Sequence, residues 1–492
     1  MREQEAKLAV DDDFEVPPLD DVLCGLDAQV VAPVERVVED TYYDTADLRL
    51  LRWGCTLRHR KRSGWTVKLP IGRTDRSVTR NEINLGGRAG KPPAEALRLV
   101  ASFSRSAPIE AIARIATRRV AVPIRSADGV PLVELTDDRV VTECGEKTTA
   151  FRQLEVELAP DADPTLLDRI VDGLLAGGAR LEPDALKLVR ALDRPTVGSP
   201  DVVVPGLTKD PTARDVIHGA IARSVQQLLV ELPRTRLGEE PEGIHQARVA
   251  TRRLRSDLRT FKPLLDPAWA ADLNPRLQVL AAHLGAVRDA DVLHQLLRSV
   301  LDANPEIDGD AGTAVLELLE RQRHDALDAL NQCLDHDDTS RLLDDLVAAA
   351  ADPPTTPDAD QPAKDQLPPL VAKRWRHLRR AVAALDRHPP APALHEVRIL
   401  AKRARYATEA IAPAFGTRTR QFAKSLAALQ DTLGDLNDGS VAGRWLTTNA
   451  DQLDPVAAFA AGRLAHQLHH APGDEWRGAW KAVERSRPRW LA

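Results

Sequence analysis

The chain has 492 residues, which is too long for one ordinary domain, so we expect two or three domains. A hydrophobic content of 43% supports real cores, and 28% charged residues argue against global disorder. The net charge of −6 and the pI near 6.1 exclude general electrostatic attraction to nucleic acid, which we do not expect as a partner. An anion site in this chain must instead gather its basic residues locally.

The cysteines and the N-terminus bear on the compartment. Cys24, Cys55, Cys144 and Cys333 are widely spaced and form no C-x-x-C pair, which favours buried free thiols in a reducing environment. The first residues are charged from Arg2 onward, and no run of about 20 apolar residues occurs. These features predict a cytoplasmic protein without a membrane segment.

The opening residues carry charges at a spacing of two, at Glu3, Glu5 and Lys7. Alternate side chains of a β-strand share a face, so these three would project together. The same alternation of ionic and apolar residues recurs at Arg58 and Arg60, Thr66 and Lys68, Arg80 and Glu82, Glu134 and Asp138, and Glu155 and Glu157. Repeated strands with one ionic and one apolar face indicate a barrel with a polar lumen. Residues 90–115 and 164–177 are interpreted as helices between these strands.

The order of these motifs resembles that of the CYTH family, the triphosphate tunnel metalloenzymes. The matches are E-x-E-x-K at Glu3, Glu5 and Lys7, Y-x-D-T at Tyr43 to Thr45, L-R-x-R at Leu57 to Arg60, T-V-K-x-P around Lys68, D-R-V at Asp138 to Val140, E-x-E at Glu155 and Glu157, and K-x-x-R-A-L from Lys187. The resemblance covers about the first 200 residues. It implies an eight-stranded antiparallel tunnel that binds triphosphate together with Mg²⁺ or Mn²⁺.

The resemblance also implies roles for individual residues. Carboxylate oxygens suit a hard divalent metal, and the expected ligands are Glu3, Glu5, Asp138, Glu155 and Glu157. Basic side chains suit phosphate oxygens, and the expected contacts are Lys7, Arg58, Arg60, Lys68, Arg80, Arg118, Arg119 and Lys187, where the strand pattern does not separate Arg118 from Arg119. Lys7, Glu5 and Glu157 are the expected catalytic residues. The alternative is that all these charges merely pair with one another as structural salt bridges.

A change of composition separates this domain from the remainder of the chain. Residues 196–210 are rich in Pro and Gly and predict a linker between a domain of residues 1–195 and a helical domain of residues 211–490. The helical domain divides into halves of about 211–350 and 368–490. The Pro- and Asp-rich segment 351–369 between them predicts an exposed connection of a composition typical of disorder.

The two halves contain the same sequence motifs. His245, Arg248, Arg252, Arg253 and Arg255 recur, with identical offsets, as His395, Arg398, Lys402, Arg403 and Arg405, displaced by 395 − 245 = 150 residues. LGAVRDADV from Leu284 is echoed by LGDLNDGSV from Leu433, displaced by 433 − 284 = 149. Two markers displaced by nearly the same interval indicate a duplicated unit. In each half, four of these five positions fall within about 80° of arc around a helix and form a basic stripe on one face.

These motifs, H-x-x-R-[VI]-x-x-[RK]-R-x-R and L-G-x-x-[RN]-D, resemble those of the CHAD family, the conserved histidine α-helical domains. The resemblance covers about residues 211–490. It implies two helical bundles related by a pseudo-twofold axis, with both stripes on a central surface that binds inorganic polyphosphate. Asp289, Asp291 and Asp438 are expected to pair with the stripes, and a solvated cationic face is the alternative. A further helical basic stripe comprises Lys373, Arg374, Arg376, Arg379 and Arg380.

The sequence therefore predicts an α+β multidomain protein, with an N-terminal antiparallel β-tunnel and a C-terminal all-α domain. We expect metal-dependent hydrolysis of inorganic triphosphate or a related triphosphate in the tunnel, and polyphosphate binding by the helices, with association with cytoplasmic polyphosphate granules. Cyclisation of ATP in the same tunnel is one alternative, and a non-catalytic polyphosphate-binding protein is another. The oligomeric state does not follow from the sequence.

Overall fold

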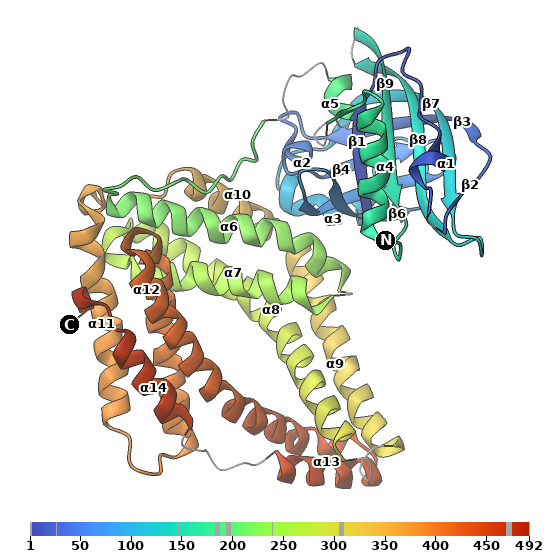
Figure 1. The fold of residues 1–492 in the computed structure, drawn as a ribbon. Coiled ribbons are helices and arrows are strands. Elements are labelled where there is room, and N and C mark those ends of the chain that lie inside the picture. Colours follow the sequence, from blue (N-terminus) through green and yellow to red (C-terminus); the bar gives the residue numbers. More distant parts are fainter. Residues whose placement is uncertain are drawn as a thin grey trace. The chain divides into compact units, whose positions relative to one another are not determined.

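The computed structural model describes residues 2–25, 27–144, 147–182, 187–192, 198–238, 240–304, 309–468 and 475–491, with only the backbone at residues 144, 147 and 435–438. Contacts divide the chain into two compact units, Met1–Asp201 and Val202–Ala492 (Figure 1). The first is a β-barrel with short helices and the second is helical, which confirms the predicted fold class.

The first unit contains ten strands within the described ranges. They are β1 (Arg2–Ala9), β2 (Gln29–Val30), β3 (Val34–Asp44), β4 (Thr56–Arg60), β5 (Gly64–Arg73), β6 (Val78–Leu85), β7 (Glu110–Arg125), β8 (Pro131–Cys144), β9 (Lys147–Leu158) and β10 (Arg180–Leu181). Its helices are α1 (Leu19–Val22), α2 (Arg49–Arg52), α3 (Ala94–Ser104), α4 (Pro164–Ala176) and α5 (Lys187–Ala191). The helix predicted at 164–177 is confirmed by α4.

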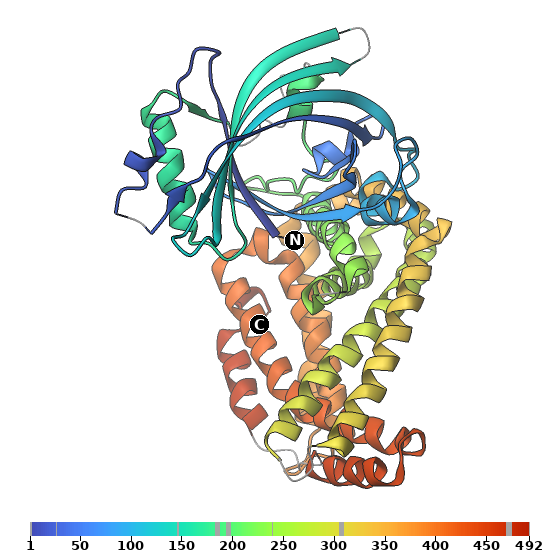
Figure 2. The same ribbon diagram turned by 90° about the vertical axis from the view of Figure 1, so that its right-hand side faces the viewer.

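Eight of the strands close into a ring. Neighbouring strands pair antiparallel in the order β1-β6-β5-β4-β3-β7-β8-β9, and β9 pairs again with β1. Figure 2 shows the strands curving around this ring. The predicted eight-stranded antiparallel barrel is therefore confirmed, with β2 and β10 as short additions to β7 and β1.

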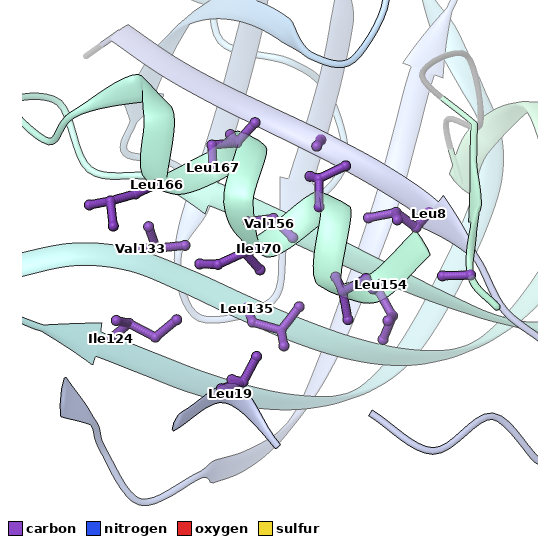
Figure 3. Packing of buried hydrophobic residues seen from close by; sticks show 14 of the residues in the cluster. Leu8, Leu19, Ile124, Val133, Leu135, Leu154, Val156, Leu166, Leu167 and Ile170 are labelled. Carbon is purple, nitrogen blue, oxygen red and sulfur yellow. The ribbon is translucent and has the colours of Figure 1, made fainter. Parts of the chain in front are cut away.

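The main hydrophobic core of this unit lies outside the ring. Helix α4 lays Leu167 and Ile170 across the outer face of the sheet, where Leu8, Leu154 and Val156 meet it (Figure 3). All five side chains are at most 1% exposed, and burial of each such side chain contributes about 1.5–3 kcal/mol. Because strand side chains alternate, packing this face outward turns the other face into the lumen.

The predicted helix at 90–115 is only partly correct. Helix α3 ends at Ser104 and β7 begins at Glu110. Within β7, Ala113 and Ile115 are buried at a spacing of two, which is the period of a strand and was overlooked. The predicted linker also begins later than expected, because Asp201 accepts hydrogen bonds from Trp53 and Arg105 of the first unit.

The second unit consists of α6 (Ala213–Leu237), α7 (Pro241–Thr260), α8 (Pro267–Asp302), α9 (Asp310–Asp335), α10 (Asp337–Ala351), α11 (Ala363–Ala383), α12 (Ala391–Thr448), α13 (Pro455–Gln467) and α14 (Glu475–Ser486). Short 3₁₀ turns occur at Lys262–Leu264, Pro357–Asp360, Ala450–Gln452 and Arg489–Leu491. A shared core contains Leu297 of α8, Leu319 of α9, Leu446 of α12 and Leu464 of α13, so the two halves pack as one body.

The sequence repeat appears as a repeated helix pair. In the first half the two motifs lie on α7 and α8, and in the second half both lie on α12. Helix α12 breaks at Gly416, whose φ of 76° is left-handed, so its two parts correspond to α7 and α8. No atom lies within 4 Å of a Cβ built at Gly416, so the backbone angle alone favours glycine there.

The predicted connection at 351–369 is exposed over about half of its residues but is ordered, which its composition did not predict. Thr355 pairs with Leu265 in a β-bridge, a 3₁₀ turn follows, and α11 already begins at Ala363. Ala359, Ala363 and Leu367 recur every four residues and are at most 2% exposed. Their burial offsets the Pro- and Asp-rich composition and fixes the segment on the helical core.

The structure describes the side chains of three of the four cysteines and the length and composition of the helices. Cys55 is buried and Cys333 half-buried, but Cys24 is exposed, which corrects the prediction of buried thiols; the Cys144 side chain lies outside the described residues. Within the described ranges, no helix is both long enough and apolar enough to cross a bilayer.

Candidate functional site

The strand register brings the predicted charges into one lumen. Glu3, Glu5 and Lys7 share a face of β1, and the pairing with β9 sets Lys7 opposite Glu155 and Glu5 opposite Glu157. The described residues that line a cavity of about 240 Å³ are Glu3, Glu5, Lys7, Arg36, Tyr42, Thr56, Arg58, Arg60, Lys68, Arg80, Glu82, Arg119, Glu134, Glu155, Glu157, Lys187 and Leu188. Charged groups thus dominate the lining, with eight basic and six acidic side chains.

Many of these charges neutralise one another. Lys7 Nζ lies 3.0 Å from Glu5 Oε1 and 3.1 Å from Glu155 Oε1. Lys68 Nζ approaches Glu3 at 2.6 Å, and Arg80 Nη1 approaches Glu5 at the same distance. Burial opposes ionisation, but these cations, Lys7 first, hold the pKa of Glu5 at about 2. Burial likewise opposes the charge of Lys7, yet Glu155 and Glu5 raise its pKa, so Lys7 is a fixed cation at neutral pH.

Structural pairing does not account for the like charges that face one another. Glu5, Glu157 and Glu134 lie directly opposite each other on β1, β9 and β8, and Arg36 lies opposite Arg119 on β3 and β7. Directly opposed like charges destabilise a sheet, so this arrangement costs stability unless something of opposite charge lies between them. Such costs are typical of binding sites.

Among these opposed carboxylates, Glu157 has the least compensation by positive charge. It lines the cavity and makes no ion pair with another described residue. Burial, followed by the charge of Glu3, raises the pKa of Glu157 to about 7 against the opposing effect of Lys68. Two cationic donors also remain spare, because the buried Nε atoms of Arg58 and Arg80 make no hydrogen bond to any residue that the structure describes.

Two predicted site residues are placed differently from expectation. Arg118 projects from the outer face of β7, where it is 64% exposed and pairs with Glu35, so Arg119 is the lumen residue. Adjacent strand positions face opposite sides, which is the physical reason. Asp138 is fully buried beneath the lining and pairs with Arg119 (2.6 Å) and with Lys187. Its oxygens are engaged by two cations, so Asp138 positions these cations.

Several charged residues of the barrel interior were given no site role from the sequence. Glu82 approaches Lys68 at 3.0 Å, and Asp40 pairs with Arg60 at 2.9 Å and Arg58 at 3.6 Å. Arg36 and Glu134 line the lumen and pair at 3.3 Å. Glu82 and Glu134 share strand parity with predicted residues, so the alternation itself was a usable signal.

The carboxylates fit a divalent metal in donor type. Glu3, Glu5 and Glu157 supply the hard oxygen ligands that Mg²⁺ and Mn²⁺ prefer, and the pKa of Glu157 is raised by burial and then by the charge of Glu3. Glu155 fits less well, because Lys7, Lys187 and Arg119 already surround it. Among the described residues, no three His, Cys, Asp or Glu side chains are gathered in an arrangement ready to hold a metal.

A second cluster of charge lies on the helical unit. The two stripes, from α7 and α12, meet at a groove of about 430 Å³. Its lining comprises His245, Arg248, Val249, Arg252, Arg288, Asp289, Val292, Leu293, Leu296, Arg398, Lys402, Gln430 and Val441. The two halves therefore build one basic groove between them. We call it the central groove.

Arg252 is a half-buried cation of the central groove. Burial lowers its pKa, and Arg248, Arg405 and Arg253 lower it further. Its Nε has no hydrogen-bond partner within the described chain, and its guanidinium lies 5.5 Å from the Tyr406 ring centroid. The pKa of His245 is likewise lowered, first by burial and then by Arg288. An anionic ligand would relieve this repulsion.

The repeated motifs contact each other in the same way in both halves. A Cβ built at Gly285 of α8 would lie 4.0 Å from the Arg248 guanidinium. At Gly434 of α12, the equivalent atom would lie 3.3 Å from Arg398. The glycine of each L-G motif therefore provides the surface on which an arginine of the H-x-x-R motif rests. This contact explains the spacing of the two markers.

Other predicted stripe residues lie outside the lining of the central groove. Arg405 and Arg253 share Glu409, at 2.7 Å and 3.5 Å, so one carboxylate partly compensates one residue from each stripe. His395 is exposed on α12, and Arg255 and Arg403 lie further along their helices.

The aspartates near the stripes meet the expectation only in part. Asp289 pairs with Arg248 at 2.6 Å, as predicted. Asp291 is 3% exposed and instead pairs with Arg323 of α9, because it points into the helical core. The side chain of Asp438 lies outside the described residues. Arg288 was missed because its counterpart in the repeat is Asn437.

The protein combines two domains: a β-barrel with a polar lumen, and a duplicated helical domain whose halves share a basic groove. The family profile described as CHAD domain matches residues 219–447. Two uncharacterised proteins of Mycobacterium tuberculosis, Rv2226 of strain H37Rv and MT2285 of strain CDC 1551, are 30% identical over 461 residues, covering 88% of this chain and 84% of theirs. The chain belongs to the CHAD-domain family.

Solved structures show weaker likeness. The CHAD domain from the plant Ricinus communis is 28% identical, with a TM-score of 0.48, and covers 58% of this chain and 96% of that one. HpAC1 from Hippeastrum, for which a dominant triphosphatase activity is described, is 16% identical with a TM-score of 0.23. That likeness covers 39% of this chain and 96% of the other. We base no functional conclusion on either structure.

Proposed function

We propose that the N-terminal barrel is a CYTH-type tunnel that hydrolyses inorganic triphosphate with Mg²⁺ or Mn²⁺, and that the helical unit binds inorganic polyphosphate. The observation that carries the first part is the lumen itself. Eight basic side chains converge there beside a row of opposed carboxylates, of which Glu157 makes no ion pair with another described residue. A metal bridging carboxylates and a phosphate chain would satisfy both groups of charges.

The chain's own cations supply phosphate contacts from several sides. Arg58, Arg80 and Arg119 line the lumen, and Arg119 is held by two bonds to Asp138. Preorganised charges of this kind stabilise the spread negative charge of a transferring phosphoryl group. Lys7, whose pKa is raised, cannot take a proton from water at neutral pH and acts as a cation toward phosphate oxygen.

Glu3, Glu5 and Glu157 would hold the metal. When bound, Mg²⁺ or Mn²⁺ would neutralise phosphate charge and orient the phosphate chain. Asp138 and Glu155 hold the cations in place from behind. In this reaction, water attacks a terminal phosphorus of tripolyphosphate and the adjacent phosphoanhydride bond breaks. The products are phosphate and pyrophosphate.

The lining favours an inorganic substrate over a nucleotide. Among the described lining residues, only Tyr42 and Leu188 offer an aromatic or aliphatic side chain. A purine needs an apolar or stacking surface, whereas a triphosphate chain needs cations. Hydrolysis of tripolyphosphate is therefore preferred to ATP cyclisation.

A substrate panel tests this proposal. The purified full chain is incubated with tripolyphosphate or ATP, each with Mg²⁺, Mn²⁺ or EDTA. We expect metal-dependent release of phosphate from tripolyphosphate and little reaction of ATP. Preferential formation of cyclic AMP and pyrophosphate from ATP would establish cyclisation instead. A folded protein inactive on both substrates would establish a non-catalytic tunnel.

Polyphosphate binding by the helical unit is supported by the central groove, where Arg252 and Lys402 from the two halves face one space. Replacing both by glutamine should strongly reduce the affinity of the full chain for long-chain polyphosphate and weaken its salt dependence. The rate of tripolyphosphate hydrolysis should not change. Wild-type-like binding by the double variant would exclude the central groove as the site.

A further inference from the structure

Four arginines gather beyond the central groove. Arg255 and Arg259 lie on α7, Arg374 on α11 and Arg403 on α12. Arg374 Nη2 donates to the backbone oxygen of Arg259 at 2.9 Å, and Arg259 Nε donates to that of Arg255 at 3.1 Å. These contacts bring α11 against the end of the α7 stripe. We call Arg255, Arg259, Arg374 and Arg403 the distal arginine cluster.

The distal arginine cluster lacks compensating negative charge. None of its four guanidinium groups forms an ion pair with a carboxylate in the described ranges. Burial lowers the pKa of Arg259, and Arg255, Arg403 and Arg374 lower it further, with no acidic group opposing them. The pKa of Arg374 is lowered by burial and by Arg403. The buried Nε of Arg255 also has no hydrogen-bond partner among the described residues.

The cluster continues the track of the central groove. Helix α7 carries His245, Arg248 and Arg252 into the groove and then Arg255 and Arg259 into the cluster. From His245 to Arg259 the helix advances about 21 Å. On α12, Lys402 lines the groove, and its neighbour Arg403 belongs to the cluster.

We propose that the distal arginine cluster is a second anion site, continuous with the central groove, and that the helical unit therefore selects polyphosphate chains long enough to occupy both. This inference rests on the proposed polyphosphate binding. A linear polyanion fits because the cations follow a line along α7, and because guanidinium groups pair readily with phosphate oxygens. Once one segment is bound in the groove, binding of the next is intramolecular, so affinity rises with chain length.

The test replaces Arg259 and Arg374 by glutamine in the full chain. Arg376→Gln is the control for the α11 substitution, since like Arg374→Gln it removes one charge from α11, at a position about 200° around the helix from Arg374. The affinities for long-chain polyphosphate and for tripolyphosphate are measured without metal at several salt concentrations. Circular dichroism confirms that each variant is folded.

We expect the double variant to lose at least tenfold in affinity for long chains but less than twofold for tripolyphosphate. The slope of log affinity against log salt should fall by roughly 0.7 for each phosphate group that the variant no longer binds. The control should match the wild type. Unchanged long-chain binding by the double variant, or an equal loss for both ligands, would overturn the length selection. A wild-type chain that binds no long-chain polyphosphate would instead overturn the proposed function, and this inference with it.

Discussion

Arg118 and Arg119 are neighbours on β7 that face opposite sides of the barrel, so they form a natural matched pair. Arg119 lies in the lumen, where its Nε is 2.8 Å from Asp138 and its Nη2 is 2.8 Å from Glu155. Arg118 is 64% exposed on the outer face. Replacing each by glutamine removes the same charge from adjacent positions of one strand.

The magnitude follows from the charged hydrogen bond to phosphate that Arg119→Gln removes. A hydrogen bond to a charged group contributes about 1.5–3 kcal/mol, which corresponds to roughly a 10- to 150-fold decrease in kcat/KM for Arg119→Gln. Both kcat and KM should change, because a phosphate contact acts in the ground state and the transition state. Arg118→Gln should stay within about twofold of the wild type, since an exposed ion pair contributes little.

The assay is steady-state release of phosphate from tripolyphosphate by the full chain, with melting curves to confirm that both variants are folded. Asp138 retains Lys187, and Glu155 retains Lys7, so Arg119→Gln leaves neither carboxylate without a cation. Equal rates for the two variants would refute the assignment of the lumen as the site of hydrolysis.

Three further predictions follow from particular side chains. Glu157→Gln should lower the apparent affinity for Mn²⁺ at least tenfold in a metal titration of activity, because the variant lacks the uncompensated carboxylate; an unchanged titration would contradict the ligand role. Burial raises the pKa of Asp257 to about 8, so the folded state retains this proton as the pH rises from about 4 to 8. Between pH 5 and pH 8, three pH units at about 1.36 kcal/mol each, the wild type should lose about 4 kcal/mol of unfolding free energy relative to Asp257→Asn, measured by urea titration at pH 5 and pH 8.5; parallel pH profiles would refute a buried neutral Asp257. Gly434→Ala should weaken long-chain polyphosphate binding several-fold by displacing Arg398, whereas Gly285→Ala, with its 4.0 Å clearance, should bind like the wild type; equal effects would show that this contact is unimportant.

Period-two alternation predicted most of the lumen, because strand geometry converts spacing directly into a shared face. Glu3, Glu5 and Lys7 were identifiable for this reason. The choice between Arg118 and Arg119 needed the register of β7 against β3 and β8, which depends on contacts far apart in the chain. The depth of Asp138 beneath Arg119 and Lys187 is likewise a property of packing rather than spacing.

The helical unit shows the same division between local pattern and tertiary contact. The duplicated text correctly indicated one groove shared by two halves, since identical offsets place equivalent residues on equivalent helix faces. Composition misled at residues 351–369, where the apolar spacing of Ala359, Ala363 and Leu367 outweighs prolines and aspartates. Arg255, Arg374 and Arg403 were identified as basic residues, but their convergence with Arg259 was not predicted, because Arg374 reaches Arg259 only through the packing of α11 against α7.

The central claim is that this chain cleaves a phosphoanhydride bond of inorganic triphosphate inside the barrel. Phosphorus-31 nuclear magnetic resonance of tripolyphosphate with the full chain and Mg²⁺ tests it most directly, because substrate and products are resolved without a coupled enzyme. We predict that the tripolyphosphate signals decay while pyrophosphate and phosphate appear in equal amounts, and that Arg119→Gln slows this conversion by about 10- to 150-fold. Unchanged tripolyphosphate signals with folded wild-type protein, or equally fast conversion by Arg119→Gln, would contradict the claim.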